Sequence, residues 1–165
     1  MKSTFSRTFT AAAVILLTAV VLLGTVFPTL VKEYLTEQTI SGLQNDANVI
    51  SNLATAYSIE GSLDRSDFVL NLNLAADISE SDVVICNTDG RIVICTCPTL
   101  GCDHLGLDVD DNYLQKVIQN GGDTATGIIR GLYEESRFVV SVPILSSNEH
   151  AFAGIVIVST PTAAT

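Results

Sequence analysis

The strongest hydrophobic pattern in the chain is an unbroken apolar run near its start. The run Ala11–Val31 contains no charged residue, and about 20 apolar residues in a helix are enough to cross the hydrocarbon core of a membrane. We expect a transmembrane helix over residues 10–31, preceded by a short segment, residues 1–9. A cleaved signal peptide is the alternative, but its apolar core is shorter, about 7–15 residues, and it ends in a small-x-small site. The end of this run offers no clear site of that kind.

Helical spacing continues after the apolar run. Apolar residues recur every three or four positions, which places them on one face of a helix from about Lys32 to Tyr57. This stripe packs on the sheet of its own domain or forms part of a dimer seam, and both can hold on different turns. The stripe consists of Ile40, Leu43, Ala47, Ile50, Ala54 and Tyr57. A second helix is expected over residues 66–76, with Phe68, Val69, Leu72 and Ala76 on its apolar face.

The pattern then changes to short runs that are rich in β-branched residues. Two such runs, residues 82–86 and 91–97, flank the tetrapeptide Asn87-Thr-Asp-Gly90, and an Asp-Gly pair between strands predicts a hairpin. A two-residue turn would pair Cys86 with Val93 and place Cys86 on the same sheet face as Cys95. A three-residue turn would place Cys86 on the opposite face.

The last part of the chain contains one further helix and three further strands. Asp108 is expected to cap a helix over residues 109–120, and Gly121 to end it. The strands are expected over residues 124–133, 137–145 and 152–160. The order of elements predicts an α+β domain with one five-stranded antiparallel sheet, covered on one face by the long N-terminal helix.

Charge is distributed unevenly about the apolar run. The formal net charge is −10, and it becomes −12 when Lys2 and Arg7 are set aside. Because positive residues stay on the cytoplasmic side of a span, residues 1–9 are expected inside a bacterial cell and the acidic domain, residues 32–160, outside it. So acidic a surface argues against a nucleic acid partner. The membrane is therefore the expected partner of residues 10–31.

Several short motifs in this order resemble a known class of receptor. They are Asp89-Gly90 in the first hairpin, Val142-Pro143-Ile144 before the last turn, and Gly154 at the start of the last strand. The chain resembles the extracytoplasmic PAS-like, single Cache type sensor region of bacterial membrane histidine kinases over about residues 10–160. The resemblance implies sensing of a small-molecule or ion signal, a homodimer, and a response regulator as downstream partner.

The chain departs from complete kinases of that class. Neither His104 nor His150 has the sequence context of a phosphorylated histidine, and no glycine-rich nucleotide lid is present. We therefore expect no catalytic residue and no cofactor in this chain, with ATP and Mg²⁺ used only by a kinase core that lies outside it. Residues 161–165 are expected to be a tail that leads to that missing part. The alternatives are the same sensor on a chemoreceptor or a cyclic-dinucleotide enzyme, and a pilin-like surface protein.

Four cysteines lie close together in the sequence of the expected extracytoplasmic domain. They are Cys86, Cys95, Cys97 and Cys102. Cysteines outside the cytoplasm tend to oxidise, and a disulfide between Cys102 and either Cys95 or Cys97 is expected. A metal site is the minor alternative, because Cys95, Cys97, Cys102 and His104 offer three sulfurs and an imidazole that suit zinc. Redox-responsive thiols are a third interpretation.

Four polar side chains are candidates for a small-ligand pocket. They are Arg130, Tyr133, Tyr113 and Arg137. In the resembling family, ligands bind between the sheet and the long connection that here spans residues 97–122. Arg130 is expected on a strand, where a guanidinium can clamp a carboxylate through two parallel hydrogen bonds. The alternative for Arg130 is a solvated ion pair with Glu134 or Glu135.

Overall fold

The computed structural model describes residues 4–59, 66–96, 104–129, 132–146 and 151–162. The chain divides into two compact units, Met1–Gln38 and Thr39–Thr165. Helix α1 (Thr4–Ile59) contributes to both units. The two units are described separately.

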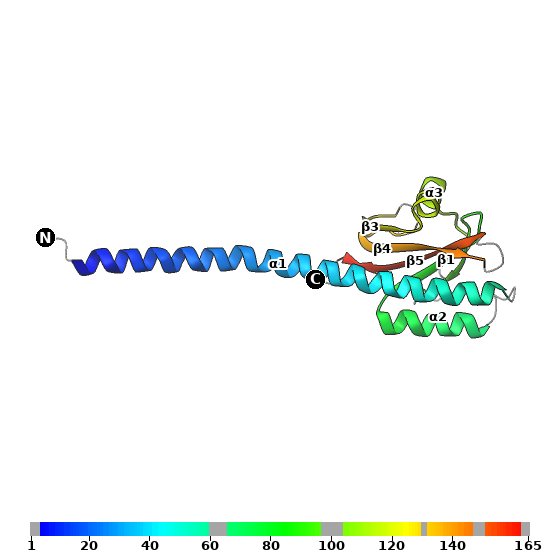
Figure 1. The fold of residues 1–165 in the computed structure, drawn as a ribbon, viewed down its shortest axis with the longest axis horizontal. Helices are drawn as coiled ribbons and strands as arrows, with labels where there is room; N and C mark the ends of the chain where they lie inside the picture. Colours follow the sequence, from blue (N-terminus) through cyan, green and yellow to red (C-terminus); the bar gives the residue numbers. More distant parts are fainter. Residues whose placement is uncertain (1–3, 60–65, 97–103, 130–131, 147–150, 163–165) are drawn as a thin grey trace. The chain divides into compact units, whose positions relative to one another are not determined.

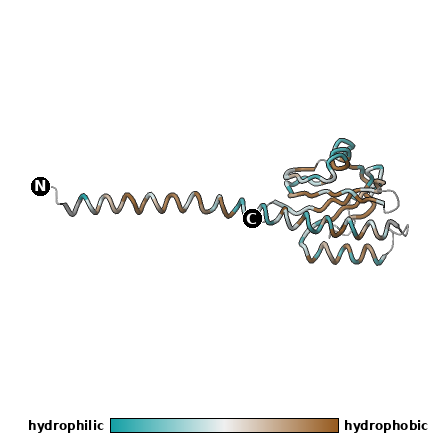
Figure 2. Tube along the Cα trace, viewed as in Figure 1, coloured by the Kyte–Doolittle hydropathy of each residue, from teal (hydrophilic) through white to brown (hydrophobic). Residues whose placement is uncertain are grey.

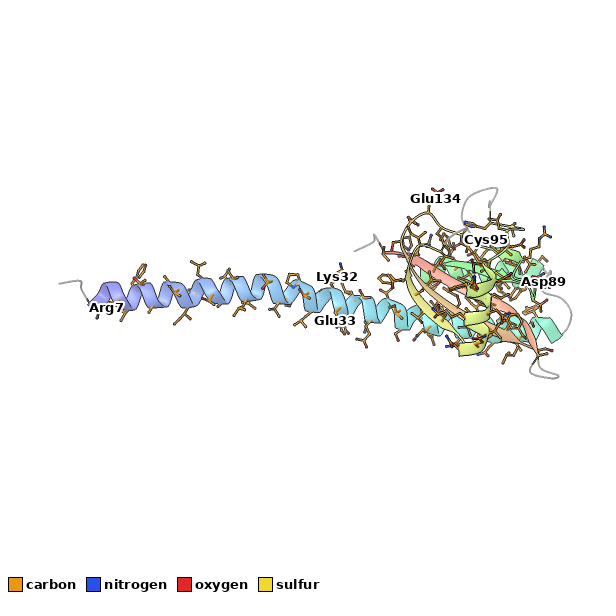
Figure 3. The ribbon with its side chains drawn as sticks, turned by 90° about the horizontal axis from the view of Figure 1, so that it is seen from above. Arg7, Lys32, Glu33, Asp89, Cys95 and Glu134 are labelled. Atoms are coloured by element: carbon orange, nitrogen blue, oxygen red, sulfur yellow. The ribbon has the colours of Figure 1, made fainter. Side chains whose placement is uncertain are left out.

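The first unit is the N-terminal part of α1. It contains a segment long and apolar enough to cross a membrane, with a mean hydropathy of 2.5 in its most apolar window and none of that window buried by protein. Figure 2 shows this part of the tube mostly in brown. Arg7 and Lys32, labelled in Figure 3, lie at the two ends of the apolar segment. Hydroxyl groups in the segment donate to backbone carbonyls one turn back, as Thr18 does to Val14 at 2.7 Å, so their hydrogen-bonding needs are met within the helix.

The second unit is built on a five-stranded antiparallel sheet with the order β2-β1-β5-β4-β3. The strands are β1 (Asp82–Cys86), β2 (Ile92–Cys95), β3 (Asp123–Gly127), β4 (Arg137–Leu145) and β5 (Phe152–Pro161). The last strand is therefore the middle strand, and it pairs with β1 on one side and β4 on the other. The expected α+β fold with a five-stranded antiparallel sheet is confirmed.

One face of the sheet is covered by two helices, the end of α1 and α2 (Ser66–Ser79) (Figure 1). The stripe expected on α1 packs here from Leu43 to Tyr57, together with Phe68 and Leu72 of α2. Each fully buried side chain of this size stabilises the fold by about 1.5–3 kcal/mol. The hydroxyl of Ser51 on α1 also donates to the carbonyl of Pro143 on β4 at 2.8 Å. Between the two interpretations of the stripe, these turns pack on the domain's own sheet.

The other face of the sheet carries helix α3 (Asp111–Asn120) (Figure 1). Leu114 and Val117 of α3 are buried against this face. Asp110 caps the helix through its carboxylate, which accepts from the backbone N–H groups of Asn112 and Tyr113. The expected cap at Asp108 is wrong, because the backbone of Asp108 instead pairs with Arg91 at the end of the hairpin.

The first hairpin has a three-residue loop. The backbone N–H of Asn87 donates to the carbonyl of Arg91 at 2.9 Å, and Gly90 adopts a φ of 82°, as expected for a turn followed by a glycine bulge. Cys86 therefore pairs with Ile92, so the pairing with Val93 is wrong. The register then shifts, and Val84 pairs with Cys95. This irregularity returns Cys95 to the face that holds Cys86.

The strand expected over residues 124–133 ends early. β3 stops at Gly127, and a turn follows in which the backbone N–H groups of Leu132 and Tyr133 donate to the carbonyl of Ile129 at 3.0 and 3.1 Å. Leu132 is buried by this turn. The extension of the strand to residue 133 is therefore wrong, and the turn delivers Tyr133 to the α3 side of the sheet.

Candidate functional site

Polar side chains occupy the α3 side of the sheet where β1, β5 and β4 lie next to one another. Ser159 of β5 is level with Asp82 of β1 on one side and with Val139 of β4 on the other. Arg137 comes two residues before Val139 and therefore points to the same face. Asp82, Ser159 and Arg137 thus form a short polar row across the three central strands.

Arg137 is the centre of this row, and only 5% of its surface is exposed. Its Nη2 atom pairs with the carboxylate of Asp82, and its Nη1 atom lies 3.0 Å from the carboxylate of Glu135. The guanidinium carbon lies 4.2 Å from the centre of the Tyr133 ring, a distance at which the cation is attracted to the ring face. One buried cation is therefore held by two carboxylates and an aromatic ring.

Two buried polar atoms in this row have unused hydrogen-bonding capacity. Within the described ranges, the Nε atom of Arg137 and the hydroxyl of Ser159 have no hydrogen-bond partner. A buried polar group without a partner costs about 1–3 kcal/mol. A water molecule or the oxygen of a small ligand would satisfy both atoms, because Nε donates and a hydroxyl can donate or accept.

A second polar contact on this face connects α3 to β4. The hydroxyls of Tyr113 and Ser141 lie 2.6 Å apart. Burial raises the pKa of Tyr113 to about 12, and its hydrogen bond with Ser141 lowers the pKa only in part. Tyr113 is therefore neutral at physiological pH and is positioned by the sheet.

His104 extends the cluster towards β2. Its ring lies edge-on to Tyr133, with 5.2 Å between the ring centres, and its Nδ1 atom lies 3.6 Å from the sulfur of Cys95. Cys95 and Glu134, both labelled in Figure 3, come from β2 and from the connection before β4. The cluster is thus assembled from segments that are far apart in the sequence.

The fold of this unit matches those of known sensor domains. No protein-family model matches the chain, and no curated protein matches it. The crystal structure of the E. coli DcuS sensor domain aligns with a TM-score of 0.55 at 13% identity, over 75% of this chain and 92% of that one. The V. cholerae histidine kinase DctB sensor domain aligns with a TM-score of 0.59 at 10% identity, over 86% of this chain and 58% of that one. The domain has a PAS/Cache-like fold.

Three of the four candidate ligand residues meet on the α3 face of the PAS/Cache-like domain. They are Tyr113, Tyr133 and Arg137. Arg130 lies outside the described residues. Glu135, considered as a partner for Arg130, pairs with Arg137 instead. Sequence analysis missed Asp82, Ser159 and Ser141, and only the strand register could have revealed them, because each looks like an ordinary strand residue.

The cysteines of the PAS/Cache-like domain do not form the expected pair in the part that can be described. No two cysteines there are joined by a disulfide, so the expected disulfide is not supported. Cys97 and Cys102 lie outside the described residues. Burial raises the pKa of the Cys86 thiol to about 12, which makes it a poor nucleophile. No group of three or more metal-binding side chains occurs among the described residues either.

A polar groove lies on the opposite face of the PAS/Cache-like sheet, beside α1. It has a volume of about 370 Å³ and includes the amide side chains of Gln44 and Asn48, the turn at Gly121 and Gly122, and Thr124 of β3. Gln44 donates to the Thr124 hydroxyl at 3.2 Å. The groove contains no unpaired charge among the described residues, because Lys116 binds Asp123 at 2.8 Å.

Proposed function

We propose that this chain is the extracytoplasmic sensor module of a membrane-bound two-component histidine kinase. The observation that carries the proposal is a PAS/Cache-like domain whose α3 face holds a buried arginine with unused hydrogen-bonding capacity, in a chain with one apolar segment long enough to span a membrane. The structural likeness to the sensor domain of the histidine kinase DctB supports the kinase assignment.

In this proposal, a small ligand binds at Arg137, Tyr133 and Tyr113, with Arg130 as a further contact. Glu135 is mostly exposed, at 58% of its side chain, so a ligand carboxylate can replace it at Arg137 at small cost. Asp82 stays in place and fixes the guanidinium. Because a ligand shifts an equilibrium only by binding one state more tightly, the exchange at Glu135 is the differential contact.

The signal then passes from the sheet to α1, in a homodimer anchored by its membrane helices. Helix shifts of about 1–2 Å at subunit interfaces are known switching motions. The kinase core that uses ATP and Mg²⁺ and the response regulator lie outside this chain. Residues 1–9 are cytoplasmic and residues 32–160 extracytoplasmic in this topology.

A thermal-shift screen of the full chain in detergent micelles tests ligand sensing. The panel contains small carboxylates, phosphates, amines and zwitterions. We expect one carboxylate class to raise the melting temperature of the wild-type chain, and we expect the shift to disappear in Ser159→Ala and in the charge-balanced double variant Arg137→Gln/Asp82→Asn. An equal shift in all variants would place the ligand elsewhere.

A hybrid receptor tests the kinase assignment. Residues 1–165 are joined to the second span and kinase core of a characterised sensor kinase, and a reporter gene under its response regulator is measured. Ligand-dependent reporter activity supports the proposal. A hybrid that is expressed, binds the ligand and leaves the reporter unchanged would argue against kinase control.

A further inference from the structure

Helix α2 is apolar on two opposite sides. Its inward side is formed by Phe68, Leu72 and Ala76, which are buried against the sheet. Its outward side carries Leu70, Leu74 and Ile78, which are 69%, 57% and 77% exposed. These three outward side chains are called the α2 stripe below.

The α2 stripe is continuous. Its residues are four positions apart, so they stand one above the other along the helix. Scattered exposed apolar residues are ordinary, but a contiguous apolar surface is a mark of an interaction site. A surface helix normally has one apolar side, and a helix that is apolar all round is normally covered all round. The stripe therefore has the composition of a covered surface.

The charges around the stripe define what can cover it. Within Thr39–Ile59 of α1 and Ser66–Ser79 of α2 there are three acidic residues, Asp46, Asp67 and Asp77, and no lysine or arginine. Arg65 precedes α2 and lies outside the described residues. Asp67 and Asp77 are exposed, and by helical spacing they lie on the outward side, at the two ends of the stripe.

We propose that the α2 stripe docks an amphipathic helix of another protein, with an apolar face flanked by lysine or arginine. The apolar face covers Leu70, Leu74 and Ile78, and the basic flanks meet Asp67 and Asp77. A second copy packed in parallel would place each of these carboxylates level with its own equivalent, and like charges oppose binding. An anionic lipid surface is repelled for the same reason.

Binding of a synthetic helical peptide to the full chain in nanodiscs of zwitterionic lipid tests this proposal. The probe carries leucines at positions i, i+4 and i+8 and lysines beside them, and it is followed by fluorescence anisotropy. We expect the double variant Leu70→Gln/Ile78→Gln to weaken binding at least tenfold. Asp67→Asn/Asp77→Asn should weaken binding several-fold and reduce its dependence on salt.

Two matched controls separate this surface from general stickiness. Ile128→Gln removes an exposed apolar side chain of similar exposure, 61%, outside α2, and should leave binding unchanged. A peptide with glutamate in place of lysine should bind at least tenfold more weakly. Equal binding of the lysine peptide to the wild-type chain and to Leu70→Gln/Ile78→Gln would overturn the proposal.

The other occupants give distinct results. Self-association in sedimentation that disappears in Leu70→Gln/Ile78→Gln would identify a second copy and overturn the proposal. Quenching of a dye on α2 by spin-labelled lipid would identify the membrane and overturn it also. The α2 stripe lies on the opposite face of the domain from Arg137, so failure here leaves ligand sensing at Arg137 standing, and the reverse.

Discussion

The hydroxyl of Tyr113 on α3 lies 2.6 Å from the hydroxyl of Ser141 on β4. This contact joins the helix to a central part of the sheet, and Ser141 is fully buried. It lies on the same face as the ion pair between Arg137 and Asp82, because Ser141 follows Arg137 by four strand positions. The two contacts hold the α3 side of the domain at two points along one strand.

Alkaline pH should destabilise the domain through Tyr113. Its pKa is raised from 10.0 to about 12 by burial, so the unfolded state loses its proton first. The contribution to stability is full below pH 10 and is lost as pH rises through 12, by about 3 kcal/mol in total. Tyr113→Phe should show a shallower decline in thermal stability between pH 10 and 12. It should also lose about 1 kcal/mol at neutral pH, the value of one hydrogen bond. Identical slopes in the two proteins would contradict this explanation.

Cys86 should resist alkylation in the folded domain. Its pKa is about 12, so the reactive thiolate is scarce at pH 8. Peptide mapping by mass spectrometry after iodoacetamide treatment should find Cys86 unmodified until denaturant is added, whereas the half-buried Cys95 is modified earlier. Rapid modification of Cys86 without denaturant would show that this side of the sheet opens readily.

Gly154→Ala should be among the most damaging single substitutions in the domain. The backbone there has a φ of 152°, and an added Cβ would lie 2.2 Å from the carbonyl oxygen of Cys86 on β1. Backbone atoms cannot give way as a flexible side chain can, so we expect a loss of about 3 kcal/mol or more in thermal unfolding. Gly42→Ala on α1 is the matched control: a Cβ there meets no atom within 4 Å, and it should stabilise the helix by up to about 1 kcal/mol. A tolerated Gly154→Ala would mean that β1 and β5 can separate.

Replacing Arg137 should cost more than replacing either of its partners. Arg137→Gln leaves the carboxylate of Asp82 without its cation, and we expect a loss of about 2–4 kcal/mol. Glu135→Gln should cost less than about 1 kcal/mol, because that carboxylate is mostly exposed. Thermal unfolding of both variants in micelles gives the comparison. Equal losses would show that burial of the Arg137 stem matters more than its charge.

The order of the elements could be predicted from the sequence because it depends on local periodicity. The α1 stripe, the strands and the cap at Gly121 all follow from spacing and residue type. The errors occurred where two solutions compete locally. Asp108 and Asp110 are equally good caps, and the backbone pairing of Asp108 with Arg91 decides between them. The hairpin at Asn87 chose the longer loop because its side-chain Oδ1 accepts from two backbone N–H groups.

The candidate site was less accessible to sequence reasoning. Tyr113, Tyr133 and Arg137 stood out as polar residues in an apolar context, and the structure brings them to one face. Asp82 was not a candidate, because its proximity to Arg137 results from the placement of β5 between β1 and β4. The outward side of α2 was missed for a different reason: Leu70, Leu74 and Ile78 alternate with the inward residues, so they read as more of the same core.

The position of β5 in the middle of the sheet has a consequence for synthesis. The pairs β1–β2 and β3–β4 share no strand until Phe152–Pro161 has been made. Until then, the nascent polypeptide carries two separate ribbons with exposed edges, which is the state in which chaperones bind and proteases cut. A premature stop codon that deletes only the final strand would therefore be expected to remove the whole domain from the cell.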